Sequence, residues 1–69
     1  MNEPRKAKLT NRELEIIKLM ANGFLAKEIA EKLKISIRTV QSHNVRIYIK
    51  LGARNKMNAV AIFMRSLHN

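Results

Sequence analysis

The segment from Ser36 to Gly52, SIRTVQSHNVRIYIKLG, decides the fold class of this chain because its pattern fits two kinds of structure. Its second half alternates apolar and polar residues, which is typical of a half-buried strand. Ser36 is, however, a favoured N-cap residue, and Gly52 suits the end of a helix. As a helix, the segment directs these side chains inward over three turns: Val40, Asn44, Ile47 and Leu51, with Ile37 and Tyr48 beside them. A lone strand would have no obvious partner, so the pattern predicts a helix over about 36–51.

Three further helices are predicted from their start signals and their apolar spacing. Thr10 and Glu13 form a capping box, in which each side chain accepts the other residue's backbone N–H, and the helix that follows ends at Gly23. A second, short helix spans about 26–33, and a last one begins near Asn55. The predicted fold class is therefore all-α, a four-helix bundle in which the second and third helices form a helix-turn-helix.

Charge and size limit the function classes. The chain has 69 residues and no cysteine, so it is one small domain held by apolar packing, without disulfides. Pro4 and the cations of residues 1–8 predict a flexible basic arm, and residues 9–69 form the folded domain. The net charge is +9, and from Lys32 to Asn69 there are eight Lys or Arg and no Asp or Glu. Such a one-sign half indicates a nucleic-acid surface, with ribosome contact or an anionic membrane as alternatives.

The outward face of the predicted 36–51 helix suits contact with base edges. The second helix of a helix-turn-helix enters the major groove of DNA. There Gln41 can pair with adenine, Arg38 can pair with guanine, and Val45 can pack on a thymine methyl group. The outward face holds Arg38, Gln41, Ser42, Val45 and Ile49, and its flank holds Thr39, His43, Arg46 and Lys50. Ile49 receives no role from this pattern.

Four motifs in order, LTNRELEIIKLMANG, KEIAEKL, ISIRTVQSH and IYIKLGA, resemble the DNA-binding domain of the LuxR/FixJ (GerE) family of bacterial transcription regulators. The resemblance covers about residues 9–67 and implies a four-helix bundle that binds double-stranded DNA as a homodimer joined through its fourth helix. It implies base-reading roles for Arg38, Gln41, Ser42 and Val45. It implies backbone contacts for Lys27, Thr39, His43, Arg46 and Lys50. The last helix is more apolar than one buried stripe requires, and we expect the dimer interface at Ala59, Ile62 and Phe63.

Two departures from the family pattern bear on stability and specificity. Leu25 stands where Ser or Thr usually caps the second helix, and the loss of such a cap costs about 1 kcal/mol. Gln41 replaces a usual Lys or Arg, which shifts the expected base preference toward adenine. The length suits either a stand-alone regulator, which Met1 favours weakly, or the output domain of a larger chain.

Three other functions fit parts of the same pattern. A sigma-factor-like promoter-recognition domain would need no dimer, an adaptor would present the last helix to a protein, and a cationic membrane-surface protein would bury it in lipid. His43 lacks enough companion ligands for a metal site, and Ser42 and Ser66 lack a base with an orienting partner. We therefore expect no metal, no cofactor, no enzyme activity and no membrane. A cytoplasmic location and RNA polymerase as a further partner are expected.

Overall fold

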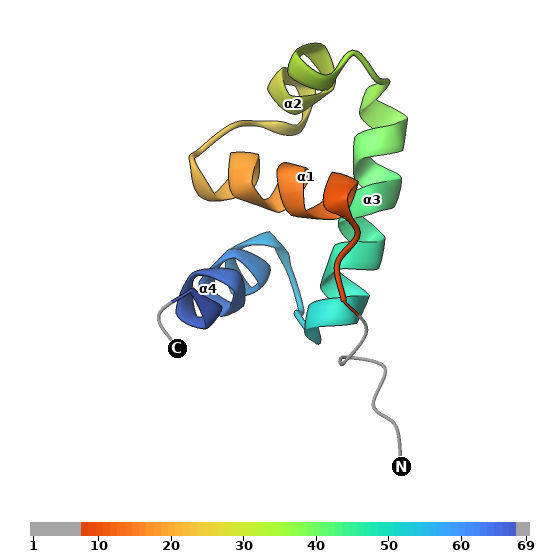
Figure 1. Cartoon of the computed structure of the whole chain (residues 1–69). Helices are drawn as coiled ribbons and strands as arrows, with labels where there is room; N and C mark the ends of the chain where they lie inside the picture. Colours follow the sequence, from red (N-terminus) through yellow and green to blue (C-terminus); the bar gives the residue numbers. More distant parts are fainter. Residues whose placement is uncertain (1–7, 68–69) are drawn as a thin grey trace.

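The computed structural model describes residues 8–67 and folds them into four helices (Figure 1). These are α1 (Asn11–Ala21), α2 (Ala26–Leu33), α3 (Ile37–Leu51) and α4 (Lys56–Ser66). No strand occurs within residues 8–67, so the all-α prediction is confirmed, and the alternating segment after Val45 belongs to a helix. Of the predicted basic arm, only Lys8 lies within the described residues.

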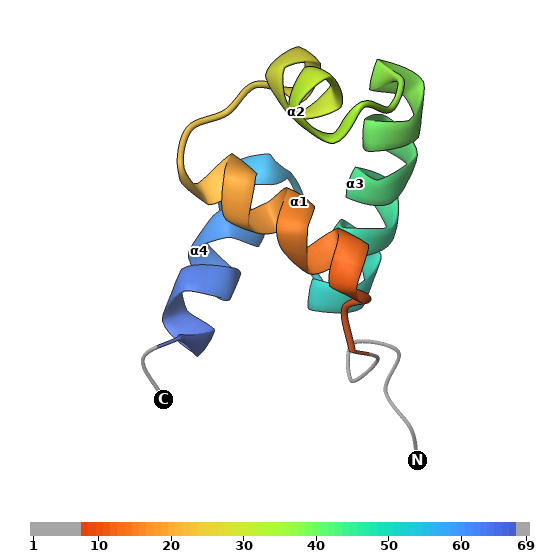
Figure 2. The same cartoon turned by 45° about the horizontal axis from the view of Figure 1, so that its top comes forward.

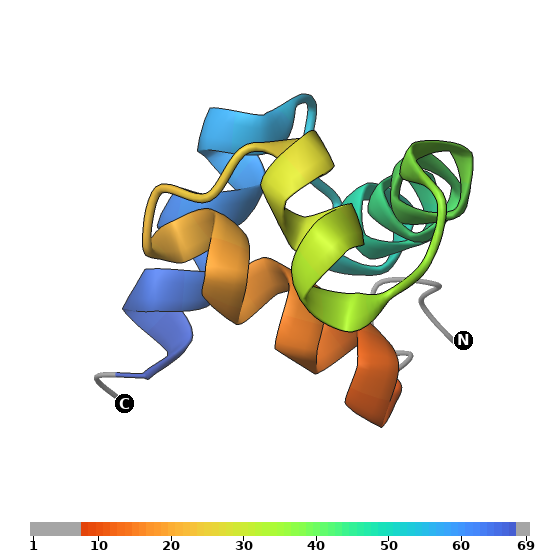
Figure 3. The same cartoon turned by 90° about the horizontal axis from the view of Figure 1, so that it is seen from above.

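Helix α3 is the longest of the four, and each of the other three helices packs against it. Helix α1 crosses α3, with α2 on one side of α1 and α4 on the other (Figures 1 and 2). Seen from above, α3 lies at one edge of the bundle (Figure 3). One side of α3 is therefore left uncovered by the other described helices.

The core takes side chains from all four helices. Its buried members are Ile16, Ile17, Met20, Ile29, Ala30, Val40, Ile47, Ala59 and Phe63. Of the predicted inward line of α3, Val40 and Ile47 are fully buried, whereas Asn44 and Leu51 are half-buried. Ile37 differs from the prediction and is exposed, because the first residue of α3 points off the line that joins Val40 and Ile47.

Three helices begin with the predicted side-chain caps. The Thr10 hydroxyl accepts the Glu13 backbone N–H (3.1 Å), and a Glu13 carboxylate oxygen accepts the Thr10 N–H (2.8 Å). Ser36 and Asn55 each accept the backbone N–H three residues further on, at 3.0 Å and 2.8 Å. These bonds satisfy N–H groups that a helix start leaves without an intrahelical partner.

Neither end of α2 carries a residue type that usually caps a helix. Leu25 supplies no side-chain cap, as predicted, although its N–H donates to the Glu28 carboxylate at 2.7 Å. At the other end Lys34 adopts the left-handed conformation, with φ of 59°. Gly52 closes α3 in the same region, with φ of 68°, where glycine carries no steric cost. The turn that sets α2 against α3 is therefore made with a residue that is strained there.

Candidate nucleic-acid interface

Helices α2 and α3 contact each other across the turn of residues 34–36 and form a helix-turn-helix. All four predicted base-reading side chains on α3 are exposed to solvent: Arg38, Gln41, Ser42 and Val45. Their spacing of three, four and seven residues from Arg38 places them on neighbouring positions of the uncovered side of α3. The structure thus brings these four residues together on one surface.

The predicted backbone-contacting residues fall into different environments. Lys27, at the start of α2, and Arg46, in the middle of α3, are exposed. Thr39 is exposed as well, and its hydroxyl lies 2.9 Å from that of Ser36. His43 is half-buried, and its Nδ1 atom is out of contact with solvent and has no hydrogen-bond partner within residues 8–67. Part of the His43 ring therefore packs on the protein.

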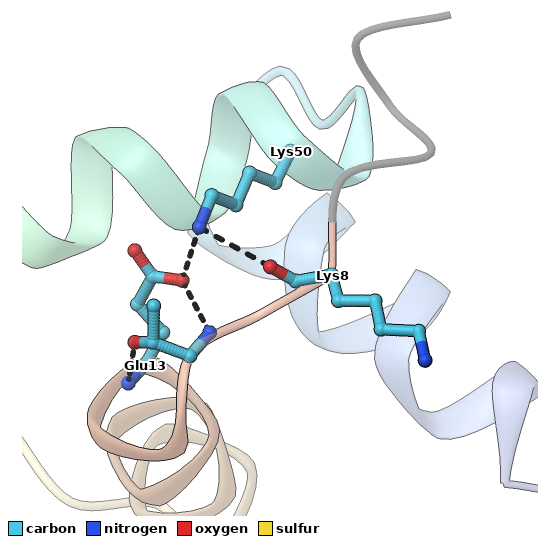
Figure 4. Close-up of polar contacts among 4 residues, drawn as sticks. Lys8, Glu13 and Lys50 are labelled. Atoms are coloured by element: carbon cyan, nitrogen blue, oxygen red, sulfur yellow. Dashed lines mark hydrogen bonds and ion pairs between the residues drawn. The ribbon is translucent and has the colours of Figure 1, made fainter.

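Lys50 differs most from its predicted role. Its Nζ atom lies 2.8 Å from a Glu13 carboxylate oxygen and 3.2 Å from the Lys8 carbonyl oxygen (Figure 4). The side chains of this ion pair are only 23% and 3% exposed for Lys50 and Glu13. The Lys50 ammonium therefore already joins the last turn of α3 to the start of α1. This argues against its being free to bind a DNA phosphate.

Glu13 has two functions at once. Its carboxylate caps α1 and also accepts from Lys50. Burial raises the pKa of Glu13, but hydrogen bonds from Lys50 and from the Thr10 backbone N–H outweigh burial and hold the pKa below its ordinary value. The carboxylate is thus ionised near neutral pH and compensates the charge of Lys50. Neither α3 nor α4 contains any Asp or Glu, so the surface charge of both helices is cationic.

Two of the three expected dimer residues of α4 are buried within the monomer. Ala59 is fully buried and Phe63 nearly so, because both pack into the core of the monomer. Ile62 is half-buried. The apolar surface that α4 does expose centres on Met57, which is 83% exposed. Beside it lies a groove of about 420 Å³, lined by Met20, Gly23, Lys56, Met57, Val60 and Ala61.

The uncovered side of α3 offers hydrogen-bonding groups and apolar contact on a cationic background, which is the chemistry of a polyanion-binding surface. Within residues 8–67 no group of three or more His, Asp or Glu side chains is placed to hold a metal ion. None of the four helices is long and apolar enough to cross a membrane. Fold and surface together define a helix-turn-helix domain of the DNA-binding class.

Comparison with known proteins narrows this class. The model of the GerE family, described as bacterial regulatory proteins of the luxR family, matches residues 7–63, and the chain belongs to this family. It is 50% identical over 52 residues to the oxygen regulatory protein NreC of Staphylococcus aureus, a match that covers 75% of this chain and 24% of NreC.

Solved structures of the Salmonella typhimurium response regulator RcsB, described for its interaction with DNA, have the same fold. One matches with a TM-score of 0.80 and 36% identity over 84% of this chain and 28% of that chain. A second has a TM-score of 0.80 and 37% identity, over 87% and 29% of the two chains. The chain thus spans about a quarter of the length of these relatives. The predicted family and helix-turn-helix fold are confirmed: the chain is a helix-turn-helix domain of the bacterial regulatory proteins of the luxR family.

Proposed function

We propose that this chain regulates transcription by binding specific sites in double-stranded DNA with α3 in the major groove. The observation that carries the proposal is the uncovered side of α3, where exposed hydrogen-bonding and apolar side chains stand on a helix without any carboxylate. A surface that only neutralised phosphates would need cations, but it would not need exposed hydrogen-bonding and apolar side chains together. A DNA partner in a bacterium also accords with a cytoplasmic location.

The contacts divide into two groups by chemistry. Arg38 and Gln41 can each form paired hydrogen bonds to one purine, Ser42 can bond to any base edge, and Val45 can pack on a thymine methyl group. The phosphate contacts fall to the flanking residues Lys27, Thr39, His43 and Arg46, which orient the helix without reading sequence. Lys50 is a weaker candidate for this second group, because Glu13 already occupies its ammonium.

A homodimer through α4 accords with the apolar side chains that this helix leaves at the surface. They recur at the spacing of one helical stripe: Met57, Val60, Ala61 and Met64. A dimer joined through this stripe would present two α3 helices to DNA, and the half-sites of helix-turn-helix dimers lie about one DNA turn apart, roughly 34–36 Å, or a multiple of it. Ile62 contributes at most its exposed part, and Ala59 and Phe63 support the stripe from inside.

The same α4 stripe could bind another protein, as in an adaptor, or RNA polymerase, as in a sigma-factor-like domain. Light scattering separates these possibilities from the dimer. We expect a monomer–dimer equilibrium that shifts toward the dimer on DNA with two half-sites. A strict monomer at high concentration and on such DNA would refute the dimer and favour the sigma-factor-like alternative.

The proposed function is tested by selecting bound sites from random duplexes. We expect repeated half-sites to be enriched, and Gln41→Ala should lose about 1–3 kcal/mol of discrimination at one base pair. Arg46→Ala is the matched control, because it should weaken all duplexes alike. If circular dichroism shows an intact fold but the selection enriches no sequence, sequence-specific binding is refuted.

A further inference from the structure

Ile49 is the most exposed large apolar residue of α3, at 62%, and Val45, one turn earlier, is 55% exposed. A single exposed apolar side chain is normal in a soluble protein. Two β-branched side chains four residues apart form a continuous apolar strip, because positions i and i+4 of a helix are neighbours about 5–6 Å apart. The strip occupies the second half of the uncovered side of α3.

The direction of Ile49 ties it to the base-reading residues. At about 100° per residue, Ile49 points within about 20° of both Arg38 and Ser42, and Val45 points within about 40° of Ile49. All four therefore stand in one row along α3. If the first three positions of the row meet base edges, the fourth faces the same groove one turn further on.

The last turn of α3 is also held in place. Lys50, the next residue, bonds to the buried Glu13 at 2.8 Å and to the Lys8 carbonyl at 3.2 Å (Figure 4). This anchor fixes the rotation of the last turn, with Lys50 directed at α1 and Ile49 directed away from it. Ile49 stays exposed even though residue 8 of the chain is held beside Lys50. Within residues 8–67 most of the Ile49 side chain thus remains uncovered.

From this row we infer that Val45 and Ile49 together read the methyl groups of two thymines in the major groove. The inference rests on the proposed DNA-binding function and adds the base class that the second half of α3 recognises. The thymine C5-methyl is an apolar group on a major-groove edge that otherwise offers donors and acceptors. β-Branched side chains suit it, because they have one strongly preferred rotamer in a helix and lose little entropy on contact.

The spacing of the two thymines follows from helix geometry. Four residues of α3 advance about 6 Å along the axis, at about 1.5 Å per residue. Base pairs are stacked about 3.4 Å apart, and a helix in the major groove is inclined to the DNA axis, so the two methyl groups should lie on neighbouring base pairs, at most about two apart. The polar half of the row, with Arg38 and Ser42, then reads the adjoining base pairs. Each half-site should therefore combine a hydrogen-bonded end and a methyl-rich end.

The test uses a duplex selected as above and replaces its thymines one at a time by deoxyuridine, which removes only the methyl group. Fluorescence anisotropy should show two sensitive positions per half-site, each losing about fourfold in affinity, the value of one buried CH₂ group. Ile49→Ala should abolish the sensitivity at one of these positions and Val45→Ala at the other. Ile49→Val should retain it. Leu67→Ala removes an equally exposed apolar side chain from the end of α4 and should change neither position.

Four results would overturn the inference. A flat deoxyuridine scan on a specifically bound site would leave the proposed function standing but exclude methyl reading. An Ile49→Ala protein that keeps both sensitive positions would remove Ile49 from the DNA surface. An Ile49→Ala protein that loses dimer in light scattering would assign Ile49 to a protein contact instead. If selection yields no specific site, the proposed function and this inference fail together.

Discussion

Replacing Lys50 by Met should destabilise the domain much more than its position near a helix end suggests. Methionine keeps an apolar stem for packing but leaves the 3%-exposed Glu13 carboxylate without its ion-pair partner. Exposed ion pairs contribute less than about 1 kcal/mol, whereas breaking a fully buried pair costs about 3–5 kcal/mol. The partly buried pair lies between these limits, and we expect a loss of about 2 kcal/mol. For a domain of this size that corresponds to a decrease in Tm of roughly 10 °C.

The chain contains a matched control for this prediction. Arg12 and Glu15 form an ion pair of 3.3 Å on the same helix as Glu13, but their side chains are 41% and 57% exposed. Glu15→Gln should therefore change the free energy of unfolding by less than about 0.5 kcal/mol. Glu13→Gln can still accept the Thr10 N–H, so with Lys50→Met it completes a double-mutant cycle that isolates the charge interaction.

The pH dependence gives a second, independent check. The pKa of Glu13 lies below its ordinary value in the folded protein, despite burial, because Lys50 and Thr10 stabilise the carboxylate. The stabilisation is therefore complete above the ordinary pKa of 4.5 and is lost as the pH falls through the folded-state pKa. Urea unfolding of wild type and Lys50→Met should differ most near neutral pH and converge in acid. A difference that stays constant down to about pH 3 would refute the argument that Lys50 acts through the Glu13 charge.

Three further predictions concern the turn, the phosphate contacts and the dimer. Lys34→Gly should stabilise the domain by about 0.5–1 kcal/mol in thermal unfolding, because the left-handed conformation costs glycine nothing, and an unchanged or lower Tm would contradict this. Arg46→Ala should reduce the slope of log affinity against log salt by about 0.9, whereas Lys50→Met should leave it unchanged, and equal slopes for the two variants would contradict the separation of their roles. Met57→Lys should abolish the dimer in analytical ultracentrifugation without unfolding the monomer, since the side chain is 83% exposed, and persistence of the dimer would exclude the α4 stripe.

Local signals in the sequence were sufficient for the four helices. The caps at Thr10, Ser36 and Asn55 act over three residues, so the residues that decide each helix start are neighbours in the chain. The conflict over the alternating segment after Val45 was also resolved locally, because a Ser cap and a Gly end enclose it. The inward line of α3 followed from periodicity alone. What these signals share is that each depends on a few adjacent residues.

Contacts between segments that are far apart in the sequence could not be predicted from such local signals. Glu13 and Lys50 are 37 residues apart, and either could equally have been solvated. The burial of Ala59 and Phe63 in the monomer was unpredictable for a similar reason, because an apolar helix does not reveal which part of its surface the other helices cover. Only the packing of α4 against α1 and α3 decides which of its apolar faces is left for a partner.

The last turn of α3 shows how far this tertiary context can reverse the usual rule. Lys50 turns inward and its apolar neighbour Ile49 turns outward, although burial would normally favour the opposite. Lys50 turns inward because the start of α1 presents a buried carboxylate and a free carbonyl there, whereas no helix lies where Ile49 points. A sequence that placed its charge at position 49 would gain solubility and phosphate attraction. That this chain has isoleucine there, in line with the residues proposed to read bases, is the reason to look for its partner on DNA.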